Sequence, residues 1–362
     1  MTTLTQASTQ WMTRPSDERF LSLDELHQFK LDQKRNSKAT AIANRGITAI
    51  PTDNHNGILI QGPNGHAVEP NHWSFGQLAS LAKAPAGYLR TLPSDMAADC
   101  INYGLHVERD VEDVGVLLSR DDDRVELRAA TGPNYGRVWD ADIIGKLRSY
   151  VGDGVTGDWR VPGEFGKEVV VDRKNTTLYA SDRDMFVFLA DEKNRIEIPN
   201  RRDGKPGSLA RGFFVWNSEV GSKTFGISTF LFDFVCMNRI VWGASDVQTV
   251  TIRHSSGAPH RFLEEAVPAL EAYSQGSISG ITNTLQLAQA KKIDDVDAFL
   301  ATRFSKRQAD LVKATHLAEE DRPIETLWDA TVGITAVART IQHQDERVDL
   351  ERVGGRILDL AA

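Results

Sequence analysis

Cationic and aromatic side chains gather between residues 195 and 223, and proteins hold single-stranded nucleic acid with these two kinds of side chain. Guanidinium and ammonium groups neutralise backbone phosphates, and exposed rings offer bases a stacking surface. The residues concerned are Arg195, Arg201, Arg202, Lys205, Arg211, Phe214, Trp216 and Lys223. We expect the cations of the loop 195–211 to contact phosphates and either Phe214 or Trp216 to stack on a base.

The strand that carries these rings can also be interpreted as part of a core. Successive side chains of a strand point to opposite faces, so Phe213 and Val215 share one face while Phe214 and Trp216 share the other. Only one of these pairs can face a ligand. The alternative to a binding groove is therefore that the rings pack inside the protein and leave the cationic loop in water.

A short polar turn follows this strand and contains Asn217, Ser218, Glu219 and Gly221. A serine beside a carboxylate could indicate nucleophilic catalysis, but such a serine needs a base, usually histidine, held by a third group. None of the nine histidines is marked by its neighbours for that role. Asn and Ser side chains bond nearby backbone groups in turns, and glycine supplies a positive φ. We expect a structural turn, with ligand binding by Asn217 or Glu219 as the alternative, and we assign no catalytic residue.

The segment from Gly221 to Thr224 resembles the end of a Walker A phosphate-binding loop. That motif needs two glycines separated by four residues, with lysine directly after the second glycine. Trp216 stands where the first glycine belongs, and Ser222 separates Gly221 from Lys223. The pattern indicates a β-turn between two strands rather than a site of nucleotide hydrolysis.

Two histidine–glutamate pairs have the spacing of metal ligands on one face of a helix. They are His260 with Glu264 and His316 with Glu320. Each pair lacks a third ligand at a spacing typical of a metal site, and such pairs usually lie on solvated helix surfaces. We therefore expect no metal site and no cofactor.

The elements that must position these residues fall into three parts. Residues 1–72 are polar and rich in turn formers, which predicts an irregular arm with one short hairpin near residues 58–60. Residues 73–255 mix helical periodicity with alternating strands, including a hairpin of residues 114–118 and 125–129. Residues 256–362 are helical. The predicted class is α+β: a mixed, mainly antiparallel sheet body with helices, followed by a C-terminal helical module.

Composition limits the kind of protein and its location. The 362 residues are 41% hydrophobic, enough to build a core, and they carry a net charge of −8. Contact with DNA must therefore come from a local basic patch. The two cysteines, Cys100 and Cys236, lie far apart, and we expect neither a secretory signal nor a membrane-spanning segment. These features predict a cytoplasmic protein.

The run from Arg211 to Gly243 resembles the signature of a family found mainly in bacteriophages, prophages and plasmids, the domain of unknown function 932. The matching pieces are Asn217 to Gly221 and Val235 to Asn238. A segment around Tyr135 and the C-terminal helical pair are similar to the family more weakly, so the resemblance spans roughly residues 73–360. The resemblance implies a role in the DNA metabolism of mobile elements, with an unsettled activity.

Our leading hypothesis is a DNA-metabolism accessory protein of a phage or plasmid that binds single-stranded DNA and forms a homo-oligomer, as an annealing or recombination mediator would. One alternative is an inhibitor that binds a protein of a host defence or nuclease system, since an acidic surface can imitate the charge of DNA. Another is an unrecognised enzyme, which a deep pocket gathering Glu219 with a histidine and an arginine would favour.

Overall fold

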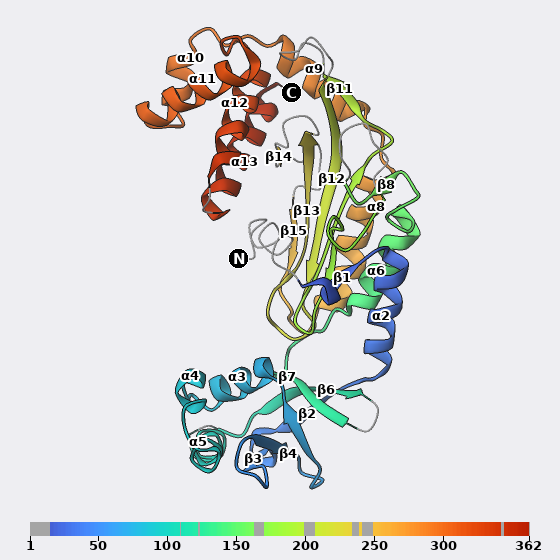
Figure 1. The fold of residues 1–362 in the computed structure, drawn as a ribbon, viewed down its shortest axis with the longest axis vertical. Coiled ribbons are helices and arrows are strands. Elements are labelled where there is room, and N and C mark those ends of the chain that lie inside the picture. Colours follow the sequence, from blue (N-terminus) through green and yellow to red (C-terminus); the bar gives the residue numbers. More distant parts are fainter. Residues whose placement is uncertain are drawn as a thin grey trace.

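The computed structural model describes residues 15–108, 110–121, 124–162, 170–198, 207–233, 239–240, 249–341 and 344–361. Two sheets and a group of C-terminal helices follow one another along the longest axis of the molecule (Figure 1). The sheets are mainly antiparallel, which confirms the predicted α+β class. Among the described residues, no helix is long and apolar enough to span a membrane.

The larger sheet has nine strands in the described part of the chain, with β1, β9, β10, β12, β13 and β14 in order; in addition, β8 pairs with β10, β11 with β12 and β15 with β13. The strands are β1 (Arg19–Phe20), β8 (Trp159–Arg160), β9 (Leu178–Ala180), β10 (Met185–Asp191), β11 (Ile196–Ile198), β12 (Gly207–Asn217), β13 (Phe225–Asp233), β14 (Arg239–Ile240) and β15 (Thr249–Ile252). The long hairpin of β12 and β13 pairs Leu209 with Asp233 and Trp216 with Gly226.

The smaller sheet has six strands in the order β2, β6, β7, β5, β4, β3, and only β5 and β7 pair in parallel. The strands are β2 (Ser37–Ala43), β3 (Thr48–Pro51), β4 (Ile58–Gln61), β5 (Ala67–Pro70), β6 (Asp113–Asp121) and β7 (Arg124–Thr131). Three helices pack on it: α3 (His72–Leu81), α4 (Ala86–Leu89) and α5 (Ser94–His106). The hairpin predicted around residues 114–129 is present as β6 and β7.

The prediction of an irregular arm over residues 1–72 is wrong for residues 15–72. This segment supplies β1, the helix α2 (Leu23–Arg35) and four strands of the smaller sheet. Its strands are short, and β2 pairs with β6, some seventy residues further along the chain. Pairing over such a separation leaves no local pattern in the sequence. The smaller sheet therefore crosses the predicted boundary at residue 72.

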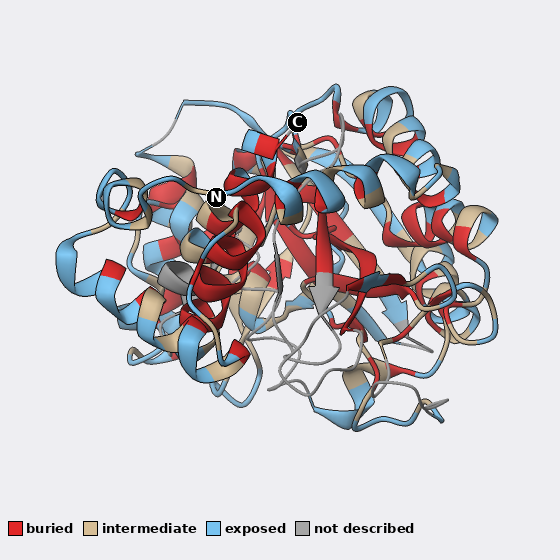
Figure 2. Cartoon of the chain, turned by 90° about the horizontal axis from the view of Figure 1, so that it is seen from above, coloured by how far each residue is buried: buried red, intermediate tan, exposed pale blue. Residues whose placement is uncertain are grey.

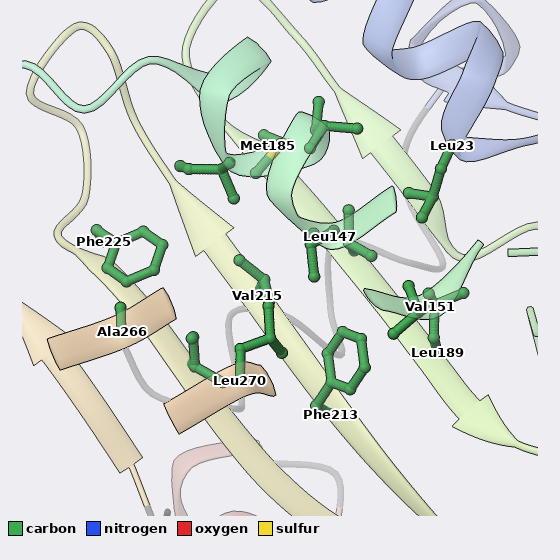
Figure 3. Close-up of a cluster of buried hydrophobic side chains, with 14 of the residues drawn as sticks. Leu23, Leu147, Val151, Met185, Leu189, Phe213, Val215, Phe225, Ala266 and Leu270 are labelled. Carbon is green, nitrogen blue, oxygen red and sulfur yellow. The ribbon is translucent and has the colours of Figure 1, made fainter. Parts of the chain in front are cut away.

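One face of the larger sheet carries the helices that complete its core. These are α2, α6 (Asp140–Val151) and α8 (Val267–Gln275) (Figure 1). Phe213 and Val215 point to this side and pack against Leu147 and Leu270, as Figure 3 shows. In Figure 2 the strands of this sheet are buried over most of their length, and the surrounding helices are exposed on their outer sides.

The opposite face of the larger sheet carries a cluster of aromatic rings. Its members are Tyr179, Phe186, Phe188, Phe214, Trp216 and Phe230, with Ala190 and Ala210 between them. Glycines on neighbouring strands make room for two of the rings: a Cβ at residue 226 would lie 2.1 Å from the ring of Trp216, and one at residue 212 would lie 2.5 Å from that of Phe230. Because successive side chains of β12 point to opposite faces of the sheet, its aromatic residues belong to two separate cores.

The C-terminal helices confirm the helical pattern predicted after residue 256. They are α7 (Ala258–Arg261), the π-helix η3 (Phe262–Ala266), α8, α9 (Ser279–Ala290), α10 (Val296–Ala301), α11 (Lys306–Glu320), α12 (Leu327–Thr340) and α13 (Gln344–Leu358). The helix α12 is central, since Leu327 to Ala338 are all buried. The helices from α9 onwards share a core with Leu209 and Leu231 at the far end of the β12–β13 hairpin.

Candidate functional site

The described residues of the predicted groove do not form a common outward face. Arg211 and the rings of Phe214 and Trp216 stand on the same strand, but residue 211 differs in parity from residues 214 and 216. Arg211 accordingly faces the helices, whereas both rings belong to the aromatic cluster on the opposite side. No single ligand could contact all three from one side of the sheet.

Arg211 is a buried structural cation rather than a phosphate ligand. Its Nε donates to Asp191 Oδ2 at 2.9 Å, and its side chain is 6% exposed. Its other nitrogens donate to three carbonyl oxygens at the end of α8, those of Tyr273, Ser274 and Gly276. The guanidinium therefore joins β10 and β12 to the helix layer, and the expected phosphate contact is corrected.

The structure also contradicts the expected stacking of a base on Phe214 or Trp216. Both residues are 2% exposed, and Phe214 packs with ring centroids 4.9 Å from Phe188 and 4.5 Å from Phe230. A base needs an accessible ring face, which these residues do not offer. The interpretation of these rings as core residues is the one that the structure supports.

The remaining cations of the predicted groove divide into paired residues and residues outside the described chain. Arg195 forms an ion pair with Glu192 and donates to its carbonyl oxygen. Lys223 lies 2.7 Å from Asp184 Oδ2 and 4.9 Å from the centroid of the Phe186 ring. Arg201, Arg202 and Lys205 lie outside the described residues, so their contact with phosphates stays a prediction.

The polar turn between β12 and β13, Asn217 to Thr224, is called the motif turn below. It lies at the end of the hairpin that meets the smaller sheet (Figure 1). Asn217 donates to the Val138 carbonyl oxygen at 2.8 Å and to Asp140 Oδ1 at 2.7 Å. Ser218 Oγ donates to the Arg183 carbonyl oxygen and accepts from the Ser222 N–H. Gly221 has a φ of +83°, which a side chain would strain.

Glu219 is the buried centre of an ionic network at this junction. Its Oε2 lies 3.3 Å from Arg128 of β7, and its Oε1 accepts the N–H of Asp140 at the start of α6 at 2.9 Å. Lys30 of α2 pairs with Asp140 at 3.1 Å. The network thus joins both sheets and two helices. Burial and the neighbouring Asp140 raise the pKa of Glu219, and the cations Lys30 and Arg128 oppose that rise.

A surface pocket of about 670 Å³ lies beside the motif turn and is called the junction pocket. It is lined by residues 132–135, 221–224 and 253–255. One wall is Tyr135, whose hydroxyl donates to the Ser218 carbonyl oxygen at 2.7 Å and whose ring stacks on His254 with centroids 4.8 Å apart. The Glu219 carboxylate is not part of the lining, so the pocket does not gather the acid–base set that an enzyme with this residue would need.

The charges around the junction pocket favour the binding of an anion. Arg253 lines it, is exposed, and makes no ion pair or side-chain hydrogen bond with any described residue. Behind the pocket, three cations accompany two carboxylates: Lys30, Arg128 and Arg137 stand against Asp140 and Glu219. His254 Nδ1 lies 3.0 Å from the Gly136 carbonyl oxygen, and burial lowers the pKa of this histidine, so the ring is neutral near pH 7.

Half-buried aromatic residues surround the motif turn. Trp73 and Trp139 both pack against the cluster that contains Val220, and Trp73 donates its indole N–H to the Val220 carbonyl oxygen at 2.9 Å. The Arg183 guanidinium lies 5.6 Å from the centroid of the Trp73 ring. Cations and partly accessible rings therefore occur together at the junction of the two sheets.

The sequence interpretation missed most of this site. Tyr135 lies in a segment noted only for its family resemblance, and Arg253 and His254 follow a short strand without any recognisable motif. The pocket is assembled from three segments, and the first and the last of them are more than a hundred residues apart in the sequence. Only the glycine and the polar residues of the motif turn gave a local signal.

Comparison with known proteins identifies a family for the region that contains the motif turn. The family model described as "Domain of unknown function (DUF932)" matches residues 173–357, which is just over half of the chain. Comparison with curated proteins and with solved structures gives no match. The matched region includes the motif turn, most of the larger sheet and nearly all of the C-terminal helices. This chain therefore belongs to the family that shares the domain of unknown function DUF932.

Proposed function

We propose that this protein binds single-stranded nucleic acid and holds a backbone phosphate in the junction pocket, as an accessory protein in the DNA metabolism of a phage or plasmid. The observation that carries the proposal is Arg253, an exposed guanidinium of the pocket without an acidic partner among the described residues. Behind the pocket, the two buried cations Lys30 and Arg128 are matched by two buried carboxylates, and the half-buried Arg137 adds one positive charge. Lys223 lines the same pocket and contributes a second cationic group, balanced by Asp184.

The partly accessible rings near the pocket support a single strand as the ligand. Stacking on an aromatic ring needs no particular base and contributes about 1–3 kcal/mol per base. Trp73 and Tyr135 each donate a hydrogen bond to the backbone of the motif turn. Unpaired bases could stack there while a phosphate binds at Arg253. As part of the same proposal, Arg201, Arg202 and Lys205 extend the phosphate path.

The proposal requires a local interface, because the chain as a whole repels polyanions. Its net charge is −8, so attraction at long range is absent and binding depends on a few close contacts. The affinity should therefore fall only shallowly with salt, because few phosphate contacts release few counterions. No nucleotide hydrolysis is needed for such binding.

Replacing Arg253 by alanine should weaken binding of a single-stranded oligonucleotide and reduce its salt dependence. One lost phosphate contact flattens the slope of log K against log salt by roughly 0.7 for a single strand. The measurement is fluorescence anisotropy of a labelled oligonucleotide across a salt series. Arg45→Ala, which removes another exposed arginine from the connection between β2 and β3, should leave both affinity and slope unchanged.

A second variant separates the junction pocket from the loop 195–211. If Arg201→Ala with Arg202→Ala flattens the slope while Arg253→Ala does not, the phosphates bind at the loop and the junction pocket is not the site. If neither variant changes binding, and the chain instead recovers one nuclease-resistant protein partner from a host lysate, the protein-binding alternative replaces this proposal.

A further inference from the structure

A second pocket, of about 480 Å³, opens in the part of the molecule built on the smaller sheet, away from the motif turn. Its apolar lining includes Ile58, Phe75 and Leu89, and its polar lining includes His55, His72 and Arg90. An apolar surface beside two histidines and an arginine suits a ligand that is flat and apolar at one end and anionic at the other. A nucleotide unit has this character.

His55 is held in an unusual conformation at the rim of this pocket. Its φ is +56°, a region that residues other than glycine rarely adopt. Two consecutive residues at the start of α5 contact it: Ser94 Oγ donates to the His55 carbonyl oxygen at 2.8 Å, and Asp95 lies 3.1 Å from Nδ1 of the His55 ring, the Asp95 and His55 side chains both being more than half exposed. A carboxylate on Nδ1 orients the ring and leaves Nε2 as the nitrogen that can accept a proton.

The pocket does not supply a nucleophile of its own. Ser94 is the serine nearest to the histidine in the lining, but it is buried and its hydroxyl proton is directed to the His55 carbonyl oxygen, not to the ring. A serine nucleophile must instead donate to its base. The attacking oxygen must therefore belong to the substrate or to water.

Arg90 lies beside the backbone of His72, and both residues line the pocket. Arg90 Nη2 donates to the His72 carbonyl oxygen at 2.9 Å, and the guanidinium lies 5.0 Å from the centroid of the Phe75 ring. No carboxylate of the described chain pairs with Arg90, since Glu69 in the same lining pairs with Arg124. The pocket thus offers a cation for a phosphate and a second histidine as a proton donor.

We propose that this pocket is an acid–base centre that cleaves RNA through the substrate's own 2′-hydroxyl. His55 Nε2 takes the proton of the 2′-hydroxyl, and the 2′-oxygen forms a bond to phosphorus. The bond from phosphorus to the 5′-oxygen breaks, and His72 in its protonated form gives that oxygen a proton. Arg90 stabilises the added negative charge on the phosphoryl oxygens. The products are a 2′,3′-cyclic phosphate and a free 5′-hydroxyl, and proton exchange with water restores both histidines.

The test compares RNA and DNA substrates with the full chain in the presence of EDTA. A ribodinucleoside monophosphate should be converted to a cyclic phosphate, and the corresponding deoxyribodinucleotide should stay intact because it lacks the 2′-hydroxyl. His55→Asn should reduce the rate by about 100-fold or more, the contribution of a general base. Asparagine tolerates a positive φ, so this variant should retain the fold. His72→Asn should reduce the rate similarly.

The control is His66→Asn, which changes an exposed histidine in the turn between β4 and β5, outside the pocket, and should leave the rate unchanged. Equal rates for the native chain, His55→Asn and His72→Asn would assign the activity to a contaminating nuclease and overturn the proposal, as would absence of any RNA cleavage. Cleavage of DNA at the same rate would overturn the role of the 2′-hydroxyl. A dinucleotide substrate does not need the junction pocket, so Arg253→Ala should cleave it normally even if the proposed strand binding fails.

Discussion

Arg211→Ala is expected to lower the free energy of unfolding by about 3–5 kcal/mol, the usual cost of removing one partner of a buried ion pair. Asp191 is 0% exposed and would keep an uncompensated charge. The three carbonyl oxygens at the end of α8 would also lose their donor. Chemical denaturation followed by circular dichroism measures the change.

The matched control for Arg211 is Lys193→Ala. Lys193 pairs with Asp158 at 3.0 Å, but both side chains are exposed, so its loss should cost less than about 1 kcal/mol. Arg211→Ala could instead unfold at the same denaturant concentration as the native chain and bind a single strand more weakly. That result would show that Arg211 contacts phosphate and would contradict its buried structural role.

Glu219→Ala is expected to have a destabilising effect of similar size, about 3–5 kcal/mol. The substitution leaves Arg128 without its carboxylate and removes the acceptor of the Asp140 N–H at the start of α6. Both groups are buried, so water cannot replace the lost contacts without rearrangement. The junction between the two sheets should loosen first, which thermal unfolding and limited proteolysis near residues 128–140 can detect.

Two further variants define the role of Glu219. Glu197→Ala removes an exposed glutamate from β11 of the same sheet and should change stability by less than about 0.5 kcal/mol. Glu219→Gln keeps an acceptor for the Asp140 N–H, so its free energy of unfolding should lie between those of the native chain and Glu219→Ala. A fully stable Glu219→Ala variant that has lost its ligand would show that this carboxylate contacts the ligand.

The helical end of the chain and the β6–β7 hairpin could be predicted because both depend on local periodicity. Leu327, Thr331, Ile334 and Ala338 repeat at helical spacing and are all buried in α12. The strands of residues 37–70 could not, because they are short and two of their four pairings, β2 with β6 and β5 with β7, reach beyond residue 110. Burial of both faces of the larger sheet likewise depends on contacts that no local pattern reveals.

The error about the groove had a warning in the sequence. Residues 211 and 214 differ in parity, so a strand through both must direct them to opposite faces. What the sequence could not reveal is that Asp191, at the end of β10, would be buried beside Arg211. Asp191, the partner that makes Arg211 a structural residue rather than a surface ligand, is twenty residues away in the sequence and lies on another strand.

The central claim, that a single strand binds at the junction pocket, is tested most directly by hydrogen–deuterium exchange with and without a single-stranded oligonucleotide at low salt. We expect slower exchange in the peptides that cover residues 132–135, 221–224 and 253–255, and no change around α12. Unchanged exchange in all three segments, with protection elsewhere or none at all, would contradict the claim.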